Sequence, residues 1–135
     1  MCTIDKQTSD GARMEMNVDE SGDGVAHVVL DGRFDIAGAQ QVDPLFAALA
    51  DSSKAMIVDL SKVSFIASLG VRTLMLSAKT LIRRGSELVV CGANENVDKV
   101  LRGTGFNEVA GLYPDYESAS RTLKERLAAF PSGKS

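Results

Sequence analysis

The chain contains 135 residues, of which 44% are hydrophobic and 24% charged, and its formal net charge at pH 7 is -3. This length is typical of one domain with a single core. The acidic balance argues against nucleic-acid binding, which usually requires a basic face. No apolar stretch approaches the about 20 residues that cross a bilayer, and the polar beginning MCTIDKQTSDGARMEM lacks the apolar segment of a secretory signal. We therefore expect a soluble, cytoplasmic protein that binds neither nucleic acid nor membrane.

The ends of the chain differ in pattern from its middle. Residues 1–12 lack periodicity and predict a flexible tail, residues 131–135 predict another, and one domain is expected over 13–130. Apolar and polar residues alternate over 14–19, which predicts a strand. The turn sequence ESGDG connects it to a second strand over 25–32, and so short a connection requires an antiparallel pair.

After the second strand the apolar period changes from two to that of a helix. Apolar residues recur at the i, i+3, i+4 and i+7 positions of one helical face: Val42, Leu45, Phe46 and Leu49. Proline is tolerated in the first turn of a helix but breaks its interior. Because of Pro44, we expect this helix to begin between residues 39 and 41.

Strands and helices then alternate to the end of the chain. The apolar run over 54–60 predicts a buried strand, and a polar loop leads to a helix over 69–84 that is closed by Gly85. A buried strand, SELVVCG, precedes a short helix with Asn94 as N-cap and Val97, Val100 and Leu101 inward. A weak edge strand, EVAGLY, and a closing helix, PDYESASRTLKERLAAF, complete the order. This order predicts an α/β fold with a mixed, mostly parallel sheet covered by helices through right-handed crossovers.

Residues that carry catalytic chemistry are scarce. The one histidine, His27, lies within a strand, and Cys91 ends an apolar strand as a small buried hydrophobe would. One histidine and two separated cysteines do not form a common zinc site. Neither a phosphate-binding loop nor a dinucleotide-binding glycine motif is present, and SFIASLG is not a nucleophile elbow because Ile66 replaces its first glycine. We expect no enzyme, no catalytic residue, no metal and no cofactor.

Ser68 stands out by its position at the carboxyl side of a buried strand and the start of a helix. Serine is a favoured N-cap, whose hydroxyl accepts a backbone N–H of the first turn. A second interpretation is phosphorylation, because a phosphoryl group there would meet the positive end of the helix and its free N–H donors. Such a group would leave the fold intact and block a partner docked over the same loop.

Several stretches together resemble the STAS domain family, in particular the small bacterial anti-sigma factor antagonists. They are LDGRFDIAGAQQV, AMIVDLSKVSFIASLGVRTLM, RRGSELVVCGANENVDKVLRGTGF and the closing helix, and the resemblance covers residues 14–127. It implies a single domain with a sheet of four or five strands, opened by an antiparallel hairpin, and about four helices packed mainly on one face. It also implies a protein that binds an anti-sigma factor, often an ATPase-fold serine kinase, and so releases the sigma factor.

The resemblance also implies a partner-switching cycle, in which the kinase phosphorylates Ser68 and ends the binding, and a PP2C-type phosphatase reverses it. The implied docking surface combines the start of one helix, the loop before Ser68 and the following helix: Asp35, Ile36, Ala37, Gly38, Ile66, Ala67, Leu69, Gly70 and Arg72. A homodimer is a further possibility. Arg83-Arg84-Gly85-Ser86 resembles a basic-directed kinase site, but the end of a helix and the start of a strand explain it better.

One departure from the family pattern concerns the loop before Ser68. Phosphorylated members have an acidic residue just before the serine, whereas this chain has Ala67, and Leu69 replaces a small polar residue. The change removes a carboxylate and adds an apolar contact where a kinase or partner would bind. An alternative is therefore a scaffold or transporter-accessory subunit that binds its partner constitutively. A third possibility is a nucleotide or small-molecule binder, although the chain has no phosphate-binding loop.

Overall fold

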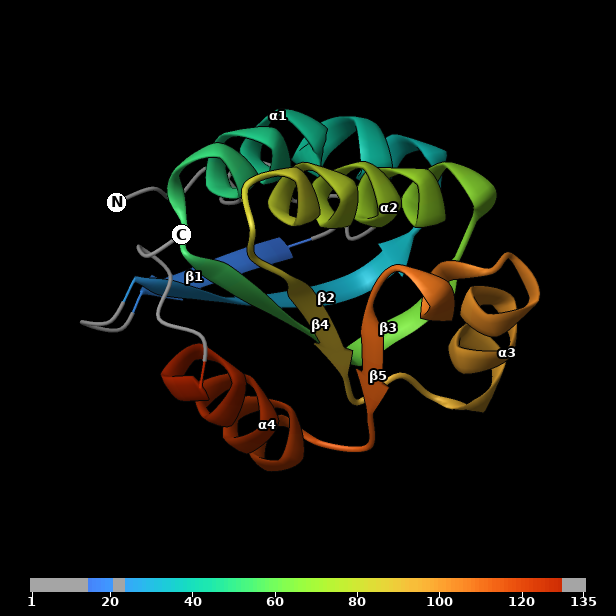
Figure 1. The fold of residues 1–135 in the computed structure, drawn as a ribbon. Coiled ribbons are helices and arrows are strands. Elements are labelled where there is room, and N and C mark those ends of the chain that lie inside the picture. The colour runs from blue at the N-terminus through green and yellow to red at the C-terminus, as the bar shows by residue number, and fades with distance from the viewer. Residues whose placement is uncertain (1–14, 21–23, 130–135) are drawn as a thin grey trace.

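The computed structural model describes residues 15–20 and 24–129 (Figure 1). The strands are β1 (Glu15–Glu20), β2 (Val25–Phe34), β3 (Ala55–Ile66), β4 (Leu88–Cys91) and β5 (Gly111–Tyr113). The helices are α1 (Ile36–Ser52), α2 (Ser68–Arg83), α3 (Glu95–Gly103) and α4 (Tyr116–Ala129), with a 3-10 turn η2 (Phe106–Glu108). The tails expected over 1–12 and 131–135, and most of the ESGDG turn, lie outside the described residues.

The five strands form one mixed sheet in the order β1-β2-β3-β4-β5. The first two strands pair antiparallel, and every later pair is parallel. Each parallel pair is joined by a crossover that includes a helix, as parallel strands require. The predicted α/β fold, with an antiparallel hairpin opening a mostly parallel sheet, is confirmed.

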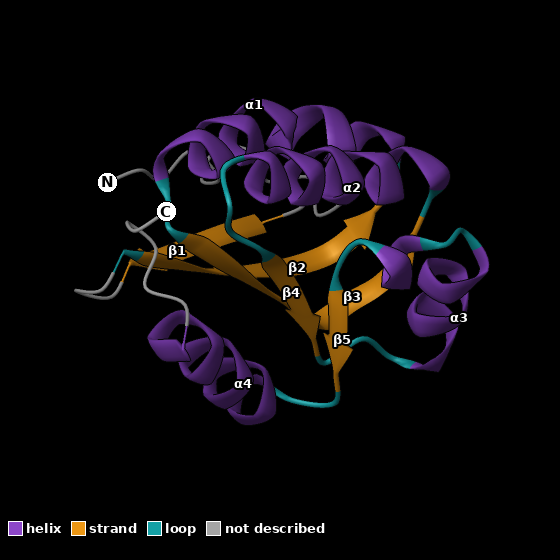
Figure 2. Ribbon diagram, in the orientation of Figure 1, coloured by secondary structure: helices purple, strands orange, loops and turns teal. Residues whose placement is uncertain are grey.

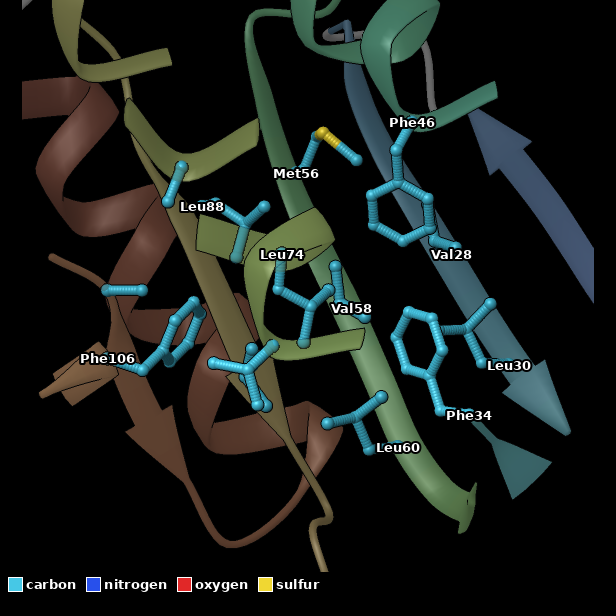
Figure 3. Close-up of a cluster of buried hydrophobic side chains, with 14 of the residues drawn as sticks. Val28, Leu30, Phe34, Phe46, Met56, Val58, Leu60, Leu74, Leu88 and Phe106 are labelled. Carbon is cyan, nitrogen blue, oxygen red and sulfur yellow. The ribbon is translucent and has the colours of Figure 1, made fainter. Parts of the chain in front are cut away.

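Helices lie on both faces of this sheet, unequally (Figure 2). The larger buried cluster joins the sheet to α1, α2 and α3, and its largest side chains include Phe34, Phe46 and Phe106 (Figure 3). A smaller cluster on the opposite face joins Val25, Ile57, Val89 and Cys91 of the sheet to α4 through Ala119 and Leu123. The helices therefore pack mainly on one face, as expected, with α4 alone on the other.

Helix α1 begins earlier than the sequence predicts. It starts at Ile36 rather than between residues 39 and 41, because Asp35 acts as N-cap and its Oδ1 accepts the Gly38 N–H at 2.9 Å. Pro44 consequently lies inside the helix, on its exposed side. Buried Val42, Phe46 and Ala50 secure this helix to the core on the other side. Tertiary packing outweighs the local cost of the proline.

Strand β3 is longer than the apolar run that predicts it. It continues to Ile66, so residues expected in a polar loop belong to the strand. The extension pairs with the end of β2, where Arg33 lies opposite Phe65 and Phe34 opposite Ile66. Two register shifts interrupt this pairing, so the extension lacks the regular alternation by which a strand is recognised. The connection from β3 to α2 consists of Ala67 alone.

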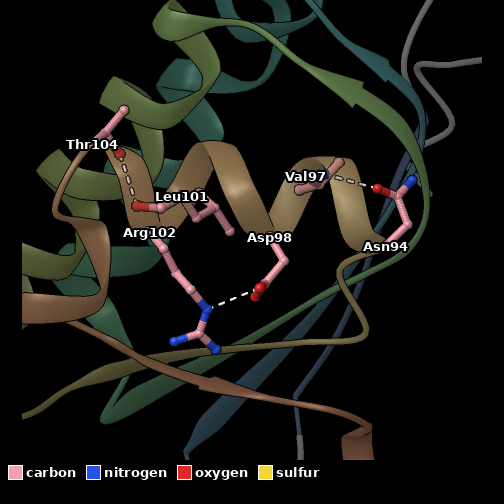
Figure 4. A network of polar contacts seen from close by, with 6 residues as sticks. All are labelled: Asn94, Val97, Asp98, Leu101, Arg102 and Thr104. Carbon is pink, nitrogen blue, oxygen red and sulfur yellow. Dashed lines mark hydrogen bonds and ion pairs between the residues drawn. The ribbon is translucent and has the colours of Figure 1, made fainter.

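Helix α3 is short and held by polar contacts at both ends (Figure 4). The predicted N-cap is confirmed, because Asn94 Oδ1 accepts the Val97 N–H at 2.8 Å. Val97 and Leu101 are buried, but Val100 is exposed, so its expected inward position is wrong. In a helix of nine residues a single narrow stripe faces the core, and Val100 lies beside it.

The segment Arg83–Ser86 is the end of α2 and the approach to β4, as predicted. Gly85 has a φ of 80°, the left-handed conformation of a residue just past a helix end. The Arg84 guanidinium lies against the end of α1, where its Nη1 donates hydrogen bonds to the carbonyl oxygens of Ala50 and Ser53 at 2.6 and 2.8 Å. This arginine therefore joins the ends of the two long helices.

Candidate partner-binding edge

The starts of α1 and α2 lie at one edge of the molecule. Both helices follow directly from the carboxyl ends of adjacent parallel strands, β2 and β3, and both begin on the right in Figure 1. The Ala67 N–H donates a hydrogen bond to the Phe34 carbonyl oxygen at 2.9 Å, which ties the two connections together. Functional residues of open α/β sheets gather at this end of the strands.

The first turn of α1 combines a rigid backbone with exposed side chains. Asp35 is half-buried because its carboxylate caps the helix, and Gly38 is buried beneath it. Ile36 is 59% exposed, and Ala37 is exposed beside it. A large apolar side chain held in solvent on a capped helix is available for contact with another protein.

The first turn of α2 presents Ser68. Ala67 occupies the N-cap position, so Ser68 is the first residue of the helix and its interpretation as N-cap is wrong. Ser68 is exposed, and its hydroxyl has no hydrogen-bond partner among the described residues. The hydroxyl is thus open to solvent beside the unpaired N–H groups of a helix start.

The remaining predicted residues divide into buried and accessible ones. Ile66 and Gly70 are buried, Ala67 and Leu69 are half-buried, and Arg72 is exposed. We use the name two-helix edge for the accessible set at these helix starts: Asp35, Ile36, Ala37, Ala67, Ser68, Leu69 and Arg72. Gly38, Ile66 and Gly70 lie beneath this surface and position it.

The two-helix edge favours added negative charge. Neither α1 nor α2 has an acidic residue in its first turn, so the N-terminal dipole of α2 is not neutralised by its own helix. The carboxylate of Asp35, at the start of α1, is engaged by the Gly38 N–H and lies 3.7 Å from Arg33 Nε. A phosphoryl group on Ser68 would therefore meet N–H donors of the helix start.

Two exposed residues, Arg33 and Phe65, lie next to this edge; the sequence places Phe65 in the expected loop before Ser68, but Arg33 and its contact with Phe65 were missed. The Arg33 guanidinium carbon lies 4.5 Å from the centroid of the Phe65 ring, and Phe65 is 41% exposed. These residues oppose each other in the extended pairing of β2 and β3. Arg33 and Phe65 occupy corresponding positions near the ends of two adjacent strands, and this spacing could have predicted their contact. It was not recognised because residues 61–66 were expected to form a loop.

The two residues considered for chemistry lie elsewhere. His27 lies near the start of β2, and Cys91 ends β4 beneath α4. Burial, with smaller contributions from the charges of Asp59 and Asp115, raises the pKa of the Cys91 thiol to about 12, which leaves it protonated and unreactive at neutral pH.

Within the described residues no group of three or more His, Cys, Asp or Glu side chains is placed to hold a metal ion. None of the helices in that part of the chain is long and apolar enough to span a membrane.

The fold is that of a small α/β domain with the exposed Ile36 and Ser68 at one edge. Residues 13–119 match the STAS domain family, and the chain belongs to that family. BtrV of Bordetella bronchiseptica, named as an anti-sigma factor antagonist, is 30% identical over 115 residues, which are 84% of this chain and 98% of BtrV.

Solved structures agree with this assignment. The crystal structure of an anti-sigma factor antagonist from Mycobacterium paratuberculosis has a TM-score of 0.75 at 26% identity and covers 82% of this chain and 94% of that one. The Bacillus cell fate determinant SpoIIAA, solved in its phosphorylated form, has a TM-score of 0.65 at 14% identity, with 80% and 99% covered. At 14% identity, the similarity to SpoIIAA shows only that the two proteins share a fold.

Proposed function

We propose that this protein is an anti-sigma factor antagonist that binds an anti-sigma factor through the two-helix edge and is released when Ser68 is phosphorylated. The observation that carries the proposal is the exposed Ser68 at the first position of α2, beside the exposed Ile36 of α1. The similarity to BtrV and to the mycobacterial antagonist supports the same role. The role is one of binding, with no catalytic step by this chain.

The composition of the two-helix edge suits a switchable contact. Ile36 supplies apolar surface, with the half-buried Leu69 and Ala67 on the α2 side, and Arg72 supplies a cation on the exposed side of α2. Burial of such apolar surface stabilises a complex, at roughly 25 cal/mol for each Å² removed from water. A phosphoryl group of about -1.5 to -2 charges at Ser68 would have to be desolvated in that contact, which costs more than the contact supplies.

The phosphorylating enzyme in this proposal is the anti-sigma factor itself, as an ATPase-fold serine kinase, and a PP2C-type phosphatase restores the binding form. Ala67, at the N-cap of α2, offers such a kinase a methyl group in place of a carboxylate. The kinase must then recognise the loop through backbone and neighbouring side chains, among which Ile36 and Arg72 are exposed.

The test titrates the purified chain against the ATPase-fold anti-sigma kinases of its own genome, with and without ATP. We expect one kinase to bind the wild type and, with ATP, to place phosphate on Ser68, as mapped by mass spectrometry. Ser68→Ala should bind without being phosphorylated. Ser68→Asp should bind about 100-fold more weakly, equivalent to about 2.7 kcal/mol.

A matched control is Asn96→Asp, which adds one negative charge to the exposed first turn of α3. It should leave binding unchanged. Phosphate found only at other residues would contradict the switch. Equal binding by the wild type and Ser68→Asp would instead favour the constitutive scaffold or transporter-accessory role.

A further inference from the structure

A small cavity lies between the sheet and α4, away from the two-helix edge. Its volume is about 70 Å³, which is room for several water molecules or the end of one side chain, since a water molecule needs about 10–15 Å³. His27 and Phe34 are at opposite ends of β2, so about 23 Å of strand separates the cavity from the edge. Residues of β1, β2, β3 and α4 line it: Asp19, Val25, His27, Ile57, Tyr116, Ser120, Leu123 and Lys124.

His27 has an unusual place in this cavity. Its ring stacks on Tyr116, with centroids 4.2 Å apart and an angle of 26° between the planes. Its Nε2 atom is shielded from solvent and has no hydrogen-bond partner among the described residues. A buried polar atom without a partner is costly, so a donor that reaches Nε2 after a small rotation of the His27 ring would gain free energy.

Part of the sheet surface next to the cavity is not covered by a described helix. Helix α4 packs chiefly over β3, β4 and β5 and also covers the start of β2 at Val25 and His27, whereas within the described residues no helix contact is recorded for Asn17 and Val29 further along β1 and β2. The pairing of β1 with β2 places Asn17 beside Val29 and Asp19 beside His27 on this same side. A peptide segment can therefore lie across these strands and direct one side chain into the cavity.

The charges on this open face select a cation. Glu15, Asp19 and Asp31 lie on it, and none of the three forms an ion pair with another described residue. Described cations near it include Lys62, opposite Asp31 on β3, Lys124 at the cavity, and Lys54, whose side chain lies against Gly24. Lys124 is exposed and can direct its ammonium group into solvent. Among the described residues, three carboxylates without an ion pair thus share this face.

We propose that this cavity binds a lysine or arginine side chain of a basic segment from a second partner protein. The stem of that side chain would pack on Val25, Ile57 and Leu123, and its charged end would pair with Asp19 and donate to His27 Nε2. The face of the His27–Tyr116 stack adds favourable contact for a cation. Because the cavity and the two-helix edge are far apart, both partners can bind at once, and the inference does not depend on the role of Ser68.

The test uses the full chain, labelled with ¹⁵N, and blocked tripeptides with a central arginine, glutamine or glutamate between alanines. The arginine peptide should shift the amide signals of His27, Tyr116 and Ser120 in a saturable way, and the other two peptides should not. Asp19→Asn should weaken this binding at least fivefold. His27→Phe keeps a ring against Tyr116 but removes Nε2, and it should weaken binding to a similar extent.

Two controls exclude simple charge attraction. Asp43→Asn makes the same charge change on the exposed side of α1 and should leave binding unchanged. Lys124→Ala should bind the arginine peptide at least as tightly as the wild type, since it removes a competing cation, and a loss of binding would overturn the proposal. Equal shifts with the glutamine peptide, an equal effect of Asp43→Asn, or no saturable shift would overturn it as well.

Discussion

At the scale of single residues, the absence of a side chain at Gly70 sets how closely α2 approaches the end of β2. A Cβ at this position would lie 2.9 Å from the Phe34 carbonyl oxygen, 3.0 Å from the Phe34 ring and 3.1 Å from the Ile66 side chain. The Phe34 carbonyl already accepts the Ala67 N–H, so the backbone there has little freedom to move. The close contact brings the starts of α1 and α2 into one surface.

Gly70→Ala should therefore destabilise the fold and disturb the two-helix edge. We expect a loss of about 1–3 kcal/mol in the free energy of unfolding, the usual cost of overpacking a core, measured by chemical denaturation. Gly103→Ala is the matched control, because a Cβ there meets nothing within 4 Å at the end of α3. That control should not lower stability by more than about 0.5 kcal/mol, because alanine is the better helix former, and an equal loss of stability in both variants would show that the contact at Gly70 is not responsible.

Cys91 makes alkaline pH destabilising. Burial raises the pKa of its thiol from 9.0 to about 12 in the folded protein, so between these values the unfolded chain loses this proton and the folded chain keeps it. The folded state is then the more protonated one, and stability falls as pH rises above about 9, by up to about 1.4 kcal/mol per pH unit for one proton. Below about pH 9 the thiol is protonated in both the folded and the unfolded chain, so it does not make stability depend on pH.

Cys91→Ala tests this pH dependence by difference. The variant loses a constant amount of packing energy at all pH values but should lack the decline that begins near pH 9. Unfolding free energies of both proteins between pH 7 and about 10.5 give the comparison, in which groups common to both chains cancel. Parallel curves across that range would show that Cys91 does not keep its proton.

At the scale of elements, Arg84 connects α1 to α2 at the ends opposite the two-helix edge. Its Nη1 donates to two carbonyl oxygens at the end of α1, those of Ala50 and Ser53. Terminal carbonyls of a helix need partners, and a cation also suits the negative end of the dipole. The pair of helices is thus joined at its start through the Ala67–Phe34 hydrogen bond and at its end through Arg84.

Arg84→Ala should lower the unfolding free energy by about 1.5–3 kcal/mol, the range for hydrogen bonds from a charged donor. Arg83→Ala removes the neighbouring arginine, whose Nη2 lies 3.5 Å from Thr80 Oγ1 on an exposed surface. It should cost less than about 0.5 kcal/mol. Thermal or urea unfolding of the two variants measures the difference, and a cost for Arg83→Ala as large as for Arg84→Ala would contradict this role.

The sequence predicted which segments are helices and strands better than it predicted where each one begins and ends. Strong periodicity identified α1, but Pro44 placed its start too late, although the spacing of Asp35 and Gly38 is that of an N-cap and its bonded N–H. The end of β3 was missed because its pairing with β2 is irregular. Such pairing depends on residues about 30 positions apart in the chain, which local pattern does not contain.

The candidate site was predicted in part. Ser68 was expected at a helix start and lies there, but its place within the first turn follows from Ala67, whose backbone is held by Phe34. The stacking of Arg33 on Phe65 was not predicted, because both residues were assigned outside a strand pairing. The cavity at His27 depends on how α4 crosses the sheet, and sequence pattern alone does not give that orientation.

At the scale of the whole molecule, the proposed contacts lie on separate surfaces of one sheet. The two-helix edge is at the carboxyl ends of β2 and β3, on the side of α1 and α2, whereas the cavity is at the other end of β2 on the side of α4. A charge added at one surface is screened in solution before it reaches the other, because the Debye length is about 8 Å at physiological ionic strength. Regulation at Ser68 should therefore act locally.

Ser68→Asp should change binding without changing the fold. The added carboxylate lies at an exposed helix start, where the dipole stabilises it by about 0.3–1 kcal/mol, and the repulsion from Asp35 acts against that gain through solvent. We expect the unfolding free energy to stay within about 1 kcal/mol of the wild type, while the affinity for the anti-sigma factor falls about 100-fold. Denaturation and binding measured on the same preparation separate the two effects. A loss of stability above about 2 kcal/mol, with binding reduced in proportion to the unfolded fraction, would mean that the charge acts by unfolding α2 and not by blocking a preformed surface.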